Sequence, residues 1–488
     1  MKVFQRFGIA LLASLCLCCM ASAQEPFTAG TWTKTTKTPP AGLAHAMLLT
    51  DGSVLALNSA CNTTGNWYRL VPDSHGSYIN GSWKAAGNLP SGYNPLYFAS
   101  AVIPSGQVVV MGGEYNACNA VWTTLGAAYS PSSNTWTSIA SPSGWSTVGD
   151  AQSVILPSGH MMMANCCTTQ EAILTLSGTT ATWASTGTGK FDENDEEGWT
   201  LLPGGKVLTV DTYVNTSCCA MGYQIYNPST GAWTTPSNNT VVNLVDSGSR
   251  ELGPMVLLPN KTVFAAGATT NNAIYTISTG TWASAPKFGG TLDIADGPAA
   301  VLPNGNALFD ASPGIFNNGS KFFEWDGTAL HATTAPPNAP VDSSYVGNFV
   351  VLPTGQILFT DFSSDVEIYT PAGSPCSGCA PTISTVATTL THGSKNNSIT
   401  GTQFNGLTQG SYYGDDNQSA SNFPLVRITD STGKVVYCRT HGWAGGVATG
   451  TKLVSTKFDV PSTIALGTAS LVVVTNGIPS APVTVTIN

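Results

Sequence analysis

Charged side chains are scarce in this sequence, and basic ones are the scarcest. Lys and Arg number 18 and Asp and Glu 27, so charged residues make up 9% of the chain. No basic stripe stands out, which excludes nucleic acid or a membrane surface as the main partner. The many uncharged polar residues are typical of a rigid extracellular β-protein. We expect a monomer that acts on a carbohydrate or another small-molecule substrate.

Beyond the N-terminal segment the sequence has no long hydrophobic run. No later segment approaches the ~20 apolar residues that cross a bilayer. The chain begins with Lys2 and Arg6, an uncharged run from Phe7 to Met20, and Ala21-Ser22-Ala23. This order predicts a signal peptide over residues 1–23 and a secreted protein with 16 basic and 27 acidic side chains, a formal charge of −11. The alternative is a lipoprotein signal that uses Cys16, Cys18 or Cys19.

The most informative feature present is a seven-fold repeat of tight turns between short apolar runs. The turns lie at Thr50-Asp51-Gly52, Pro104-Ser105-Gly106, Pro157-Ser158-Gly159, Pro203-Gly204-Gly205, Pro259-Asn260-Lys261, Pro303-Asn304-Gly305 and Pro353-Thr354-Gly355. Corresponding positions are 44 to 56 residues apart, close to the period of roughly 50 residues of kelch propeller blades. The predicted fold class is all-β, with a seven-bladed kelch-type β-propeller.

Four apolar or aromatic segments in each repeat predict the four strands of a blade. In the second repeat they are Ser100–Ile103, Gln107–Met111, Ala127–Tyr129 and Thr135–Ser138. The seventh repeat lacks its fourth strand, and an orphan segment with that signature, Thr31-Trp32-Thr33-Lys34, lies near the N-terminus. We expect this segment to close the ring, which removes the free edges of an open array. Tryptophans of the fourth strands are expected in the blade cores: Trp83, Trp136, Trp183, Trp233 and Trp282.

The repeat predicts a propeller over residues 24–374, followed by a linker over 375–382. Beyond it, residues 383–488 alternate apolar strands with turns roughly every 8 to 12 residues, the pattern of an immunoglobulin-like β-sandwich. The predicted strands are Pro424–Ile428, Lys434–Tyr437, Leu453–Phe458, Ala469–Val474 and Val483–Ile487.

Nine cysteines remain after the signal peptide, and an oxidising compartment favours their pairing. We expect Cys61 to bond to Cys118, and the doublet Cys166-Cys167 to bond to the doublet Cys218-Cys219. The alternative is a vicinal bond inside each doublet, which is strained. Cys376 and Cys379 are expected to form a local staple, which leaves Cys438 as the free thiol.

The chain resembles the extracellular galactose oxidase and glyoxal oxidase group. The segments that carry this resemblance are Leu96 to Gly106 with Gly112-Gly113, Ser344 to Gly347 through Gly355, and Phe458 to Ser462. It implies a secreted kelch propeller followed by an early-set immunoglobulin-like domain. One fold hosts many functions, so these motifs specify the fold more strongly than the activity.

The resemblance also implies where a copper-radical site would lie. The family's two tyrosines fall on Tyr97 and Tyr345 and its distant histidine on His441, while the cross-linked cysteine falls on Leu43 and the adjacent histidine on Val346. Copper(II) favours imidazole nitrogen, and this set offers one imidazole where the family offers two. We therefore expect no radical copper centre. His45 is the other local imidazole that would compensate.

Carboxylates recur seven positions before the turn prolines, where the first strand of a blade begins. They are Asp150, Glu196 and Asp296, and we expect them to converge on the axis of the ring. Such a group suits a hard cation such as calcium, or acid and base roles across a glycosidic bond. The alternatives are a solvated acidic loop over residues 192–197 and turn-capping roles for Asp150 and Asp296.

Other predicted substrate contacts surround these carboxylates. Tyr97 and Tyr345 offer faces for stacking on a sugar, and Arg250 an anchor for an acidic one. His441 is expected to bind substrate or to seal the domain interface. The loop Tyr412 to Gln418 is polar enough to bind calcium, but its spacing differs from the EF-hand, so we expect it to order a long turn or dock on the propeller.

Three functional hypotheses remain open. The first is a secreted carbohydrate-active enzyme, a glycan hydrolase or lyase in which Asp150, Glu196 and Asp296 are catalytic. The second is a propeller that binds a glycan or a protein without catalysis. The third is a copper oxidase with an altered ligand set.

Overall fold

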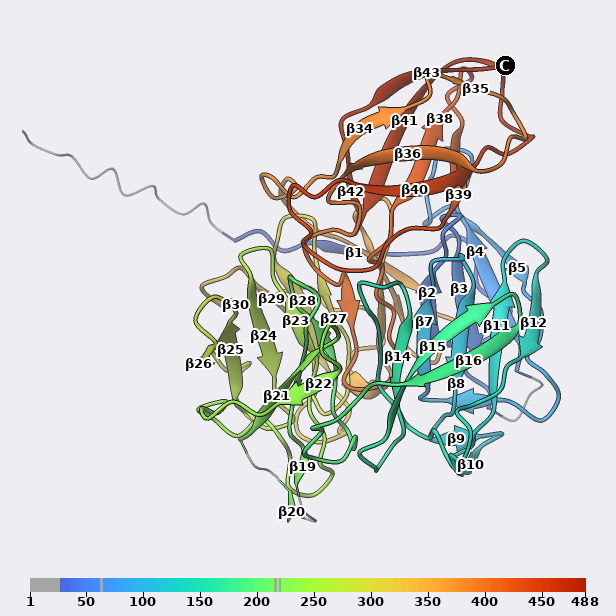
Figure 1. The fold of residues 1–488 in the computed structure, drawn as a ribbon. Coiled ribbons are helices and arrows are strands. Elements are labelled where there is room, and N and C mark those ends of the chain that lie inside the picture. The colour runs from blue at the N-terminus through green and yellow to red at the C-terminus, as the bar shows by residue number, and fades with distance from the viewer. Residues whose placement is uncertain (1–26, 62–64, 215–216, 219–220) are drawn as a thin grey trace, which may run out of the picture.

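The computed structural model describes residues 27–488 apart from 62–64, 215–216 and 219–220 (Figure 1). The predicted signal peptide therefore lies outside the described residues. The described chain is almost entirely β, and its one helical element is a 3-10 turn, η1 (Ser344–Val346). None of its helical segments has the length and apolar character needed to traverse a bilayer.

Seven sheets of the described chain each contain four antiparallel strands in the order of a propeller blade. The strands of blades 1 to 4 are β2 (Leu43–Leu48), β3 (Val54–Asn58), β4 (Trp67–Val71) and β5 (Ser82–Ala85); β7 (Ala99–Val102), β8 (Val108–Met111), β11 (Gly126–Ser130) and β12 (Thr135–Ser138); β13 (Ser153–Ile155), β14 (Met161–Ala164), β15 (Glu171–Ser177) and β16 (Thr180–Ser185); and β17 (Thr200–Leu201), β18 (Val207–Val210), β21 (Tyr223–Asn227) and β22 (Ala232–Thr234). Those of blades 5 to 7 are β23 (Met255–Leu257), β24 (Thr262–Ala266), β25 (Asn272–Thr276) and β26 (Thr281–Ala285); β27 (Ala299–Val301), β28 (Ala307–Ala311), β29 (Lys321–Trp325) and β30 (Leu330–Ala332); and β31 (Asn348–Val351), β32 (Ile357–Thr360), β33 (Glu367–Thr370) and β1 (Thr31–Lys34).

The last blade is closed by the N-terminal strand, as the sequence predicts. β1 pairs with β33 in antiparallel register, with Trp32 opposite Tyr369. Neighbouring blades contact one another through their first strands, for example β7 with β13 and β27 with β31. The first strands therefore surround the axis, and the loops that precede them open onto it.

A tyrosine and a tryptophan pair across the two outer strands in blade 7, where Trp32 lies opposite Tyr369, and in three further blades. Tyr129 lies opposite Trp136 in blade 2, Tyr226 opposite Trp233 in blade 4, and Tyr275 opposite Trp282 in blade 5. Their ring centres are 5.1, 5.3 and 5.0 Å apart. Each pair buries a large aromatic surface inside its blade, which explains why the repeat carries these residues.

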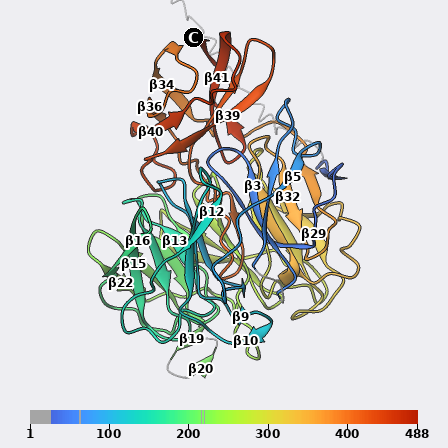
Figure 2. The same cartoon turned by 90° about the vertical axis from the view of Figure 1, so that its right-hand side faces the viewer.

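The C-terminal strands form a sandwich at one end of the ring (Figures 1 and 2). Its strand path is β34 (Thr382–Val386), β36 (Asn397–Thr402), β40 (Val454–Asp459), β39 (Val435–His441), β38 (Leu425–Thr429), β41 (Gly467–Thr475), β43 (Val483–Ile487) and β35 (Thr389–Leu390), with β42 (Ile478–Pro479) beside β41. β39 pairs with β38 through its first half and with β40 through its second, so it joins the two sheets. Apolar residues such as Ile399, Phe458 and Leu471 fill a separate core between them.

A short strand of the C-terminal region leaves the sandwich and joins the propeller. β37 (Ser411–Tyr412) pairs with β27 and becomes a fifth strand of blade 6. The ribbon shows this orange segment entering the ring (Figure 1). The sequence pattern does not predict this strand. Small strands on the propeller loops complete the fold: β6 (Pro95–Leu96), β9 (Tyr115–Asn116), β10 (Asn119–Ala120), β19 (Tyr213–Val214) and β20 (Ser217–Cys218).

The disulfides agree with the predicted pairing except at the first doublet. Cys61 bonds to Cys118, Cys376 bonds to Cys379, and Cys438 is a buried free thiol. Cys166 bonds to its neighbour Cys167, so the predicted bond between the two doublets is wrong for these two residues. The loop after β14 brings the two neighbouring sulfur atoms together, which is the vicinal alternative. The partner doublet includes Cys219, which lies outside the described residues.

Removing the Cys61–Cys118 bond is expected to lower the free energy of unfolding by about 4 kcal/mol, since it closes a loop of 57 residues. The double variant Cys61→Ala, Cys118→Ala is compared with wild type by urea denaturation. Cys376→Ala, Cys379→Ala is the matched control, because its short loop predicts a loss of only about 2 kcal/mol. A larger loss in the control than in the long-loop variant would contradict this ranking.

Candidate functional site

A cavity of about 390 Å³ opens on the propeller axis among the loops that precede the first strands of the blades. Its volume lies within the range of small-molecule sites. Five carboxylic acids and four aromatic side chains line it together with Ser249: Glu114, Asp150, Glu196, Glu251, Asp296, Tyr97, Tyr115, Phe316 and Tyr345. The structure thus brings together Asp150, Glu196 and Asp296, the three carboxylates that repeat counting places at the axis.

The backbone at several of these positions has an uncommon conformation. Tyr97, Glu196 and Asp296 have φ angles of 52°, 55° and 52°, in the left-handed region that side chains other than glycine rarely adopt. Each of the three lies a few residues ahead of the first strand of its blade. Because such residues cost free energy of order 1 to 3 kcal/mol, the surrounding fold must hold them in place, a situation typical of functional sites.

Three carboxylates form a compact group in the wall of this cavity. One oxygen from each of Glu196, Glu251 and Asp296 lies within 4.8 Å of the others. Glu251 is 6% exposed, and the other two are partly exposed to the cavity. These acids come from the loops before β17, β23 and β27, so three successive blades supply them.

A loop of the C-terminal region supplies two further carboxylates next to this wall. Asp415 and Asp416 follow β37 and are 2% and 1% exposed. Hydrogen bonds hold the loop on the propeller: the amide of Asn417 donates to the carbonyl oxygen of Phe98 over 3.1 Å, and the hydroxyl of Tyr413 donates to the carbonyl oxygen of Tyr345 over 2.6 Å. One oxygen each of Asp150, Asp415 and Asp416 lies within 4.8 Å of the others.

The electrostatics of the cavity are dominated by uncompensated carboxyl groups. Burial, followed by neighbouring carboxylates, raises the pKa of Asp150, Glu196, Glu251 and Asp296 well above the usual range. The same causes raise the pKa of Glu114 to about 7. No Lys or Arg of the described chain lines the cavity. Carboxyl groups this close repel one another when all are ionised. They must therefore share protons or bind a cation.

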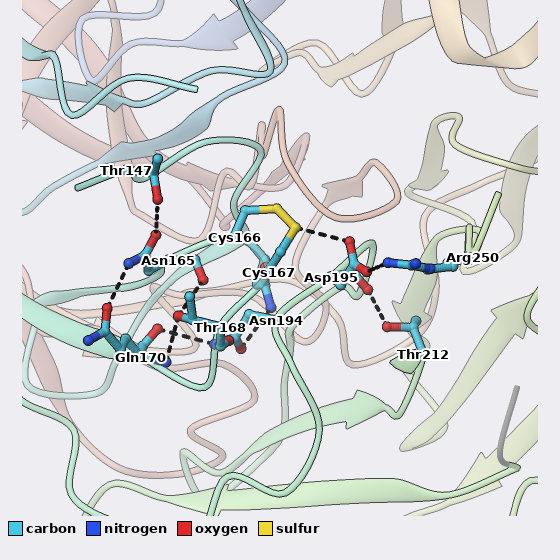
Figure 3. The surroundings of a disulfide bond; sticks show 11 residues. Thr147, Asn165, Cys166, Cys167, Thr168, Gln170, Asn194, Asp195, Thr212 and Arg250 are labelled. Atoms are coloured by element: carbon cyan, nitrogen blue, oxygen red, sulfur yellow. Dashed lines mark hydrogen bonds and ion pairs between the residues drawn. A yellow bond between two sulfur atoms is a disulfide. The ribbon is translucent and has the colours of Figure 1, made fainter. Parts of the chain in front are cut away.

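Arg250, the predicted anchor for an acidic sugar, does not line this cavity. It forms an ion pair with Asp195, and its guanidinium carbon lies 3.8 Å from the ring centre of Tyr213. The ion pair lies beside the vicinal disulfide, where Sγ of Cys167 is 3.1 Å from Oδ1 of Asp195 (Figure 3). This arginine therefore neutralises Asp195 rather than any acid of the cavity.

Most of the remaining acidic run is buried rather than solvated, and Glu193 is half-buried. Lys190 contacts Asp192 and lies 3.0 Å from Oε1 of Glu197, and both carboxylates have side chains that are 0% exposed. Glu197 also accepts hydrogen bonds from Gln152, over 2.9 Å, and from the indole of Trp199, over 3.2 Å. The alternative of a solvated acidic loop is therefore wrong. Lys190 compensates the charge of the buried carboxylates, which lowers the electrostatic cost of burying them.

His441 lies in β39, where it pairs with Lys457, and its Nε2 is 3.3 Å from Oδ1 of Asp459. It is not among the cavity residues. The C-terminal region reaches the axis through the loop that carries Asp415 and Asp416 instead. The resemblance predicts that His441 reaches the axis, because it follows aligned motifs. In the structure, strand β39 continues through His441 and holds it in the sandwich.

Sequence reasoning misses several residues of the site. Glu114 and Tyr115 follow the glycine pair at the end of β8, and Phe316 lies in a loop of blade 6. Two aspartates in succession after Tyr412-Tyr413-Gly414 were the available signal for the C-terminal loop. Their burial depends on contacts over some 300 residues, and local pattern does not encode such contacts.

No protein-family model and no curated protein sequence matches this chain. Among solved structures, it is similar to a fungal alcohol oxidase with catalytic diversity among the AA5 family, determined in complex with copper. The TM-score is 0.55 and the identity 12%, over 94% of this chain and all of the oxidase. The chain has a galactose-oxidase-like fold. At this identity the similarity shows the fold alone.

Two further solved structures match this chain with lower TM-scores. One is YjhT, with a TM-score of 0.41 and 12% identity over 61% of this chain and 99% of YjhT. The other is the extracellular domain described for a one-component system of B. thetaiotaomicron, with a TM-score of 0.45 and 10% identity over 95% of this chain and 58% of that domain.

The donor atoms of the cavity do not fit a copper-radical centre. The cavity offers carboxylate and phenol oxygens, and none of the residues that line it is a histidine or cysteine. Leu43 is buried in the blade core. His45 is also buried, within hydrogen-bonding distance of Ser100 and Asn348, and burial lowers its pKa to about 3. Copper(II) favours imidazole nitrogen, so this set of donor atoms is a poor one for copper.

Buried acids in the blades predict a pH-dependent stability. Burial raises the pKa of Asp310 from 3.8 to about 8, so the folded chain keeps a proton that the unfolded chain releases between these values. Stability therefore falls as pH rises, by about 1.4 kcal/mol per pH unit for this group. Asp310→Asn is expected to remove that part of the slope and to be more stable than wild type at pH 8. Urea denaturation at pH 5 and pH 8 measures it, and parallel curves for both proteins would contradict it.

Proposed function

We propose that this chain is a secreted glycoside hydrolase that cleaves neutral or amino-sugar glycans in its axial cavity. The observation that carries this proposal is that Glu196 and Asp296, from different blades, present oxygens within 4.8 Å of each other in an aromatic-walled cavity. Paired carboxylic acids are the usual catalytic groups of glycosidases. Tyr97 and Tyr345 supply faces on which a pyranose ring stacks.

The charge of the cavity supports hydrolysis over the lyase alternative. Lyases of acidic polymers must bind a uronate, and Arg250, the anchor expected for one, pairs with Asp195 outside the cavity. An acidic wall without a basic side chain repels a uronate and accepts a neutral or a cationic sugar. The charge of the cavity therefore favours a hydrolase over a lyase.

The contacts of the two carboxyl groups support distinct roles. Burial and neighbouring carboxylates raise the pKa of both groups, and at Asp296 a hydrogen bond with Glu251 opposes this rise. We assign Asp296 as the nucleophile that attacks the anomeric carbon, and Glu196 as the acid that protonates the departing glycosidic oxygen. Glu196 then takes a proton from the water that releases the sugar from Asp296. We assign Asp150 a positioning role in the wall beside this pair.

The separation of the carboxyl groups predicts the stereochemical outcome. Retaining glycosidases hold their two carboxyl groups about 5 to 5.5 Å apart, and inverting ones about 6.5 to 9.5 Å apart. One oxygen of Glu196 and one of Asp296 lie at most 4.8 Å apart, which is nearer to the retaining range than to the inverting one. NMR of the first product formed is expected to show the anomeric configuration of the substrate. The opposite anomer as first product would contradict the assigned roles.

The test of the function itself is a panel of neutral, amino-sugar and uronate polysaccharides with the mature protein. The proposal expects new reducing ends from a neutral or amino-sugar member, and none with the triple variant Asp150→Ala, Glu196→Ala, Asp296→Ala. Binding is measured on the same panel. Affinity without product in wild type would favour a non-catalytic binding propeller and overturn the hydrolase.

A further inference from the structure

We propose that Asp150, Asp415 and Asp416 form a binding site for one calcium ion, which fastens the C-terminal loop to the propeller. Asp150 comes from the loop before β13 in blade 3, and the two other aspartates follow β37. The three carboxylates meet although some 265 residues separate them along the chain. This inference does not depend on the proposed hydrolysis.

The spacing of the three oxygens suits calcium. Each aspartate offers one oxygen within 4.8 Å of the other two. Calcium binds oxygens at about 2.3 to 2.6 Å, so two ligands on opposite sides of the ion are about 4.6 to 5.2 Å apart. Magnesium, at about 2.0 to 2.1 Å, also fits within this limit, but it demands a near-ideal octahedron and usually keeps several waters rather than binding in an all-protein site. Three carboxylates also match the hard, oxygen-rich ligand sets that calcium prefers.

Unpartnered oxygens provide a second and independent indication of a ligand. Oδ1 of Asp150, Oδ2 of Asp415 and Oδ1 of Asp416 are buried and lack a hydrogen-bond partner within the described part of the chain. The residues are 8%, 2% and 1% exposed. Buried polar atoms are nearly always satisfied, so three such oxygens that belong to one group indicate a missing partner that all three coordinate.

No protein cation compensates for these charges. None of the ion pairs among the described residues includes Asp150, Asp415 or Asp416. The basic side chains that flank the acidic run of residues 192–197 and the cavity acid Glu251, Lys190 and Arg250, are bound to Asp192 and Asp195 instead. A divalent cation satisfies the free oxygens and neutralises most of the charge, which buried carboxylates require.

The position of the site predicts its effect on the fold. The loop with Asp415 and Asp416 is the part of the C-terminal region that reaches the axis, and Asp150 belongs to the ring. A calcium ion between them therefore links the two regions and supports the acidic wall next to it. Without the ion, repulsion among the three carboxylates works against the same contact.

The experiment uses the mature protein freed of metal by a chelator, with calcium chloride as the added probe. Calorimetric titration is expected to show one ion per chain with a dissociation constant of about 10⁻⁵ M or tighter. Asp415→Asn and Asp416→Asn are each expected to weaken binding at least tenfold. Glu193→Gln, which removes one charge from the neighbouring acidic run, is the matched control and is expected to keep wild-type affinity.

Thermal unfolding of the same proteins separates calcium binding from proton sharing. Wild type is expected to melt higher with calcium than without it. Asp416→Asn is expected to melt higher than wild type without calcium, because repulsion is lost, and to gain little when calcium is added. No binding by wild type at millimolar calcium, or equal affinity in all variants, would overturn the site. If calcium binds and no glycan is cleaved, the hydrolase proposal fails alone.

Discussion

Replacing Glu196 with Gln is expected to lower kcat for glycan cleavage by about 10³-fold, with KM changed less than about threefold. The amide keeps the shape and the hydrogen-bonding reach of the carboxyl group but has no proton to give to the leaving oxygen, and general acid catalysis is worth about 10²- to 10⁴-fold. The loss therefore falls on the chemical step rather than on binding. Steady-state kinetics on the substrate found by the panel measures it.

The matched control for this variant is Glu193→Gln, three positions away in the same acidic run. Glu193 does not line the cavity, so this variant is expected to keep wild-type kcat. A leaving group of low pKa needs little protonation and is expected to restore much of the rate in Glu196→Gln. Wild-type activity in Glu196→Gln, or an equal loss in both variants, would contradict the assigned role of Glu196.

Ending the chain at residue 374, at the predicted end of the propeller, is expected to destabilise the ring strongly. The truncated chain lacks β37, which pairs with β27, and the loop that packs on Phe98 and Tyr345. Side chains buried on that interface, among them Tyr412 and Tyr413, are each 1% exposed. Removing them exposes apolar surface around the axis, and this exposure lowers the free energy of unfolding by roughly 25 cal/mol per Å².

Circular dichroism and thermal unfolding measure this loss, and a Tm at least about 15 °C lower, or insoluble protein, is expected. The control is the full chain cut at an engineered protease site after Ser374. The two pieces are expected to stay together and to melt close to the intact protein, because the interface survives. A truncated ring that melts within a few degrees of wild type would show that the C-terminal region is dispensable for the fold.

The propeller is predictable from sequence because each blade is a local unit. A turn, two apolar runs and a Tyr–Trp pair such as Tyr129 and Trp136 lie within one repeat, so the period exposes the architecture. The N-terminal strand around Trp32 is predictable for the same reason, since it carries the signature that the seventh repeat lacks. The position of Asp150, Glu196 and Asp296 at the axis also follows from repeat counting.

The parts that sequence reasoning misses depend on contacts between distant segments. Asp415 and Asp416 have no counterpart in the repeat, and their meeting with Asp150 follows from the path of the C-terminal loop through the ring. Arg250 lies one residue from a cavity acid, yet its side chain pairs with Asp195. Neighbouring positions in a loop point in different directions, and repeat counting does not resolve them.

The measurement that tests the central claim most directly is covalent trapping of the nucleophile. The mature protein is treated with a 2-deoxy-2-fluoro glycoside of the sugar that it releases, which slows the breakdown of a glycosyl-enzyme, and the adduct is located by peptide mapping. The account predicts one adduct per chain, on the carboxylate of Asp296, and none in Asp296→Asn. An adduct on a residue outside the axial cavity, or product release with retention and no adduct at all, would contradict it.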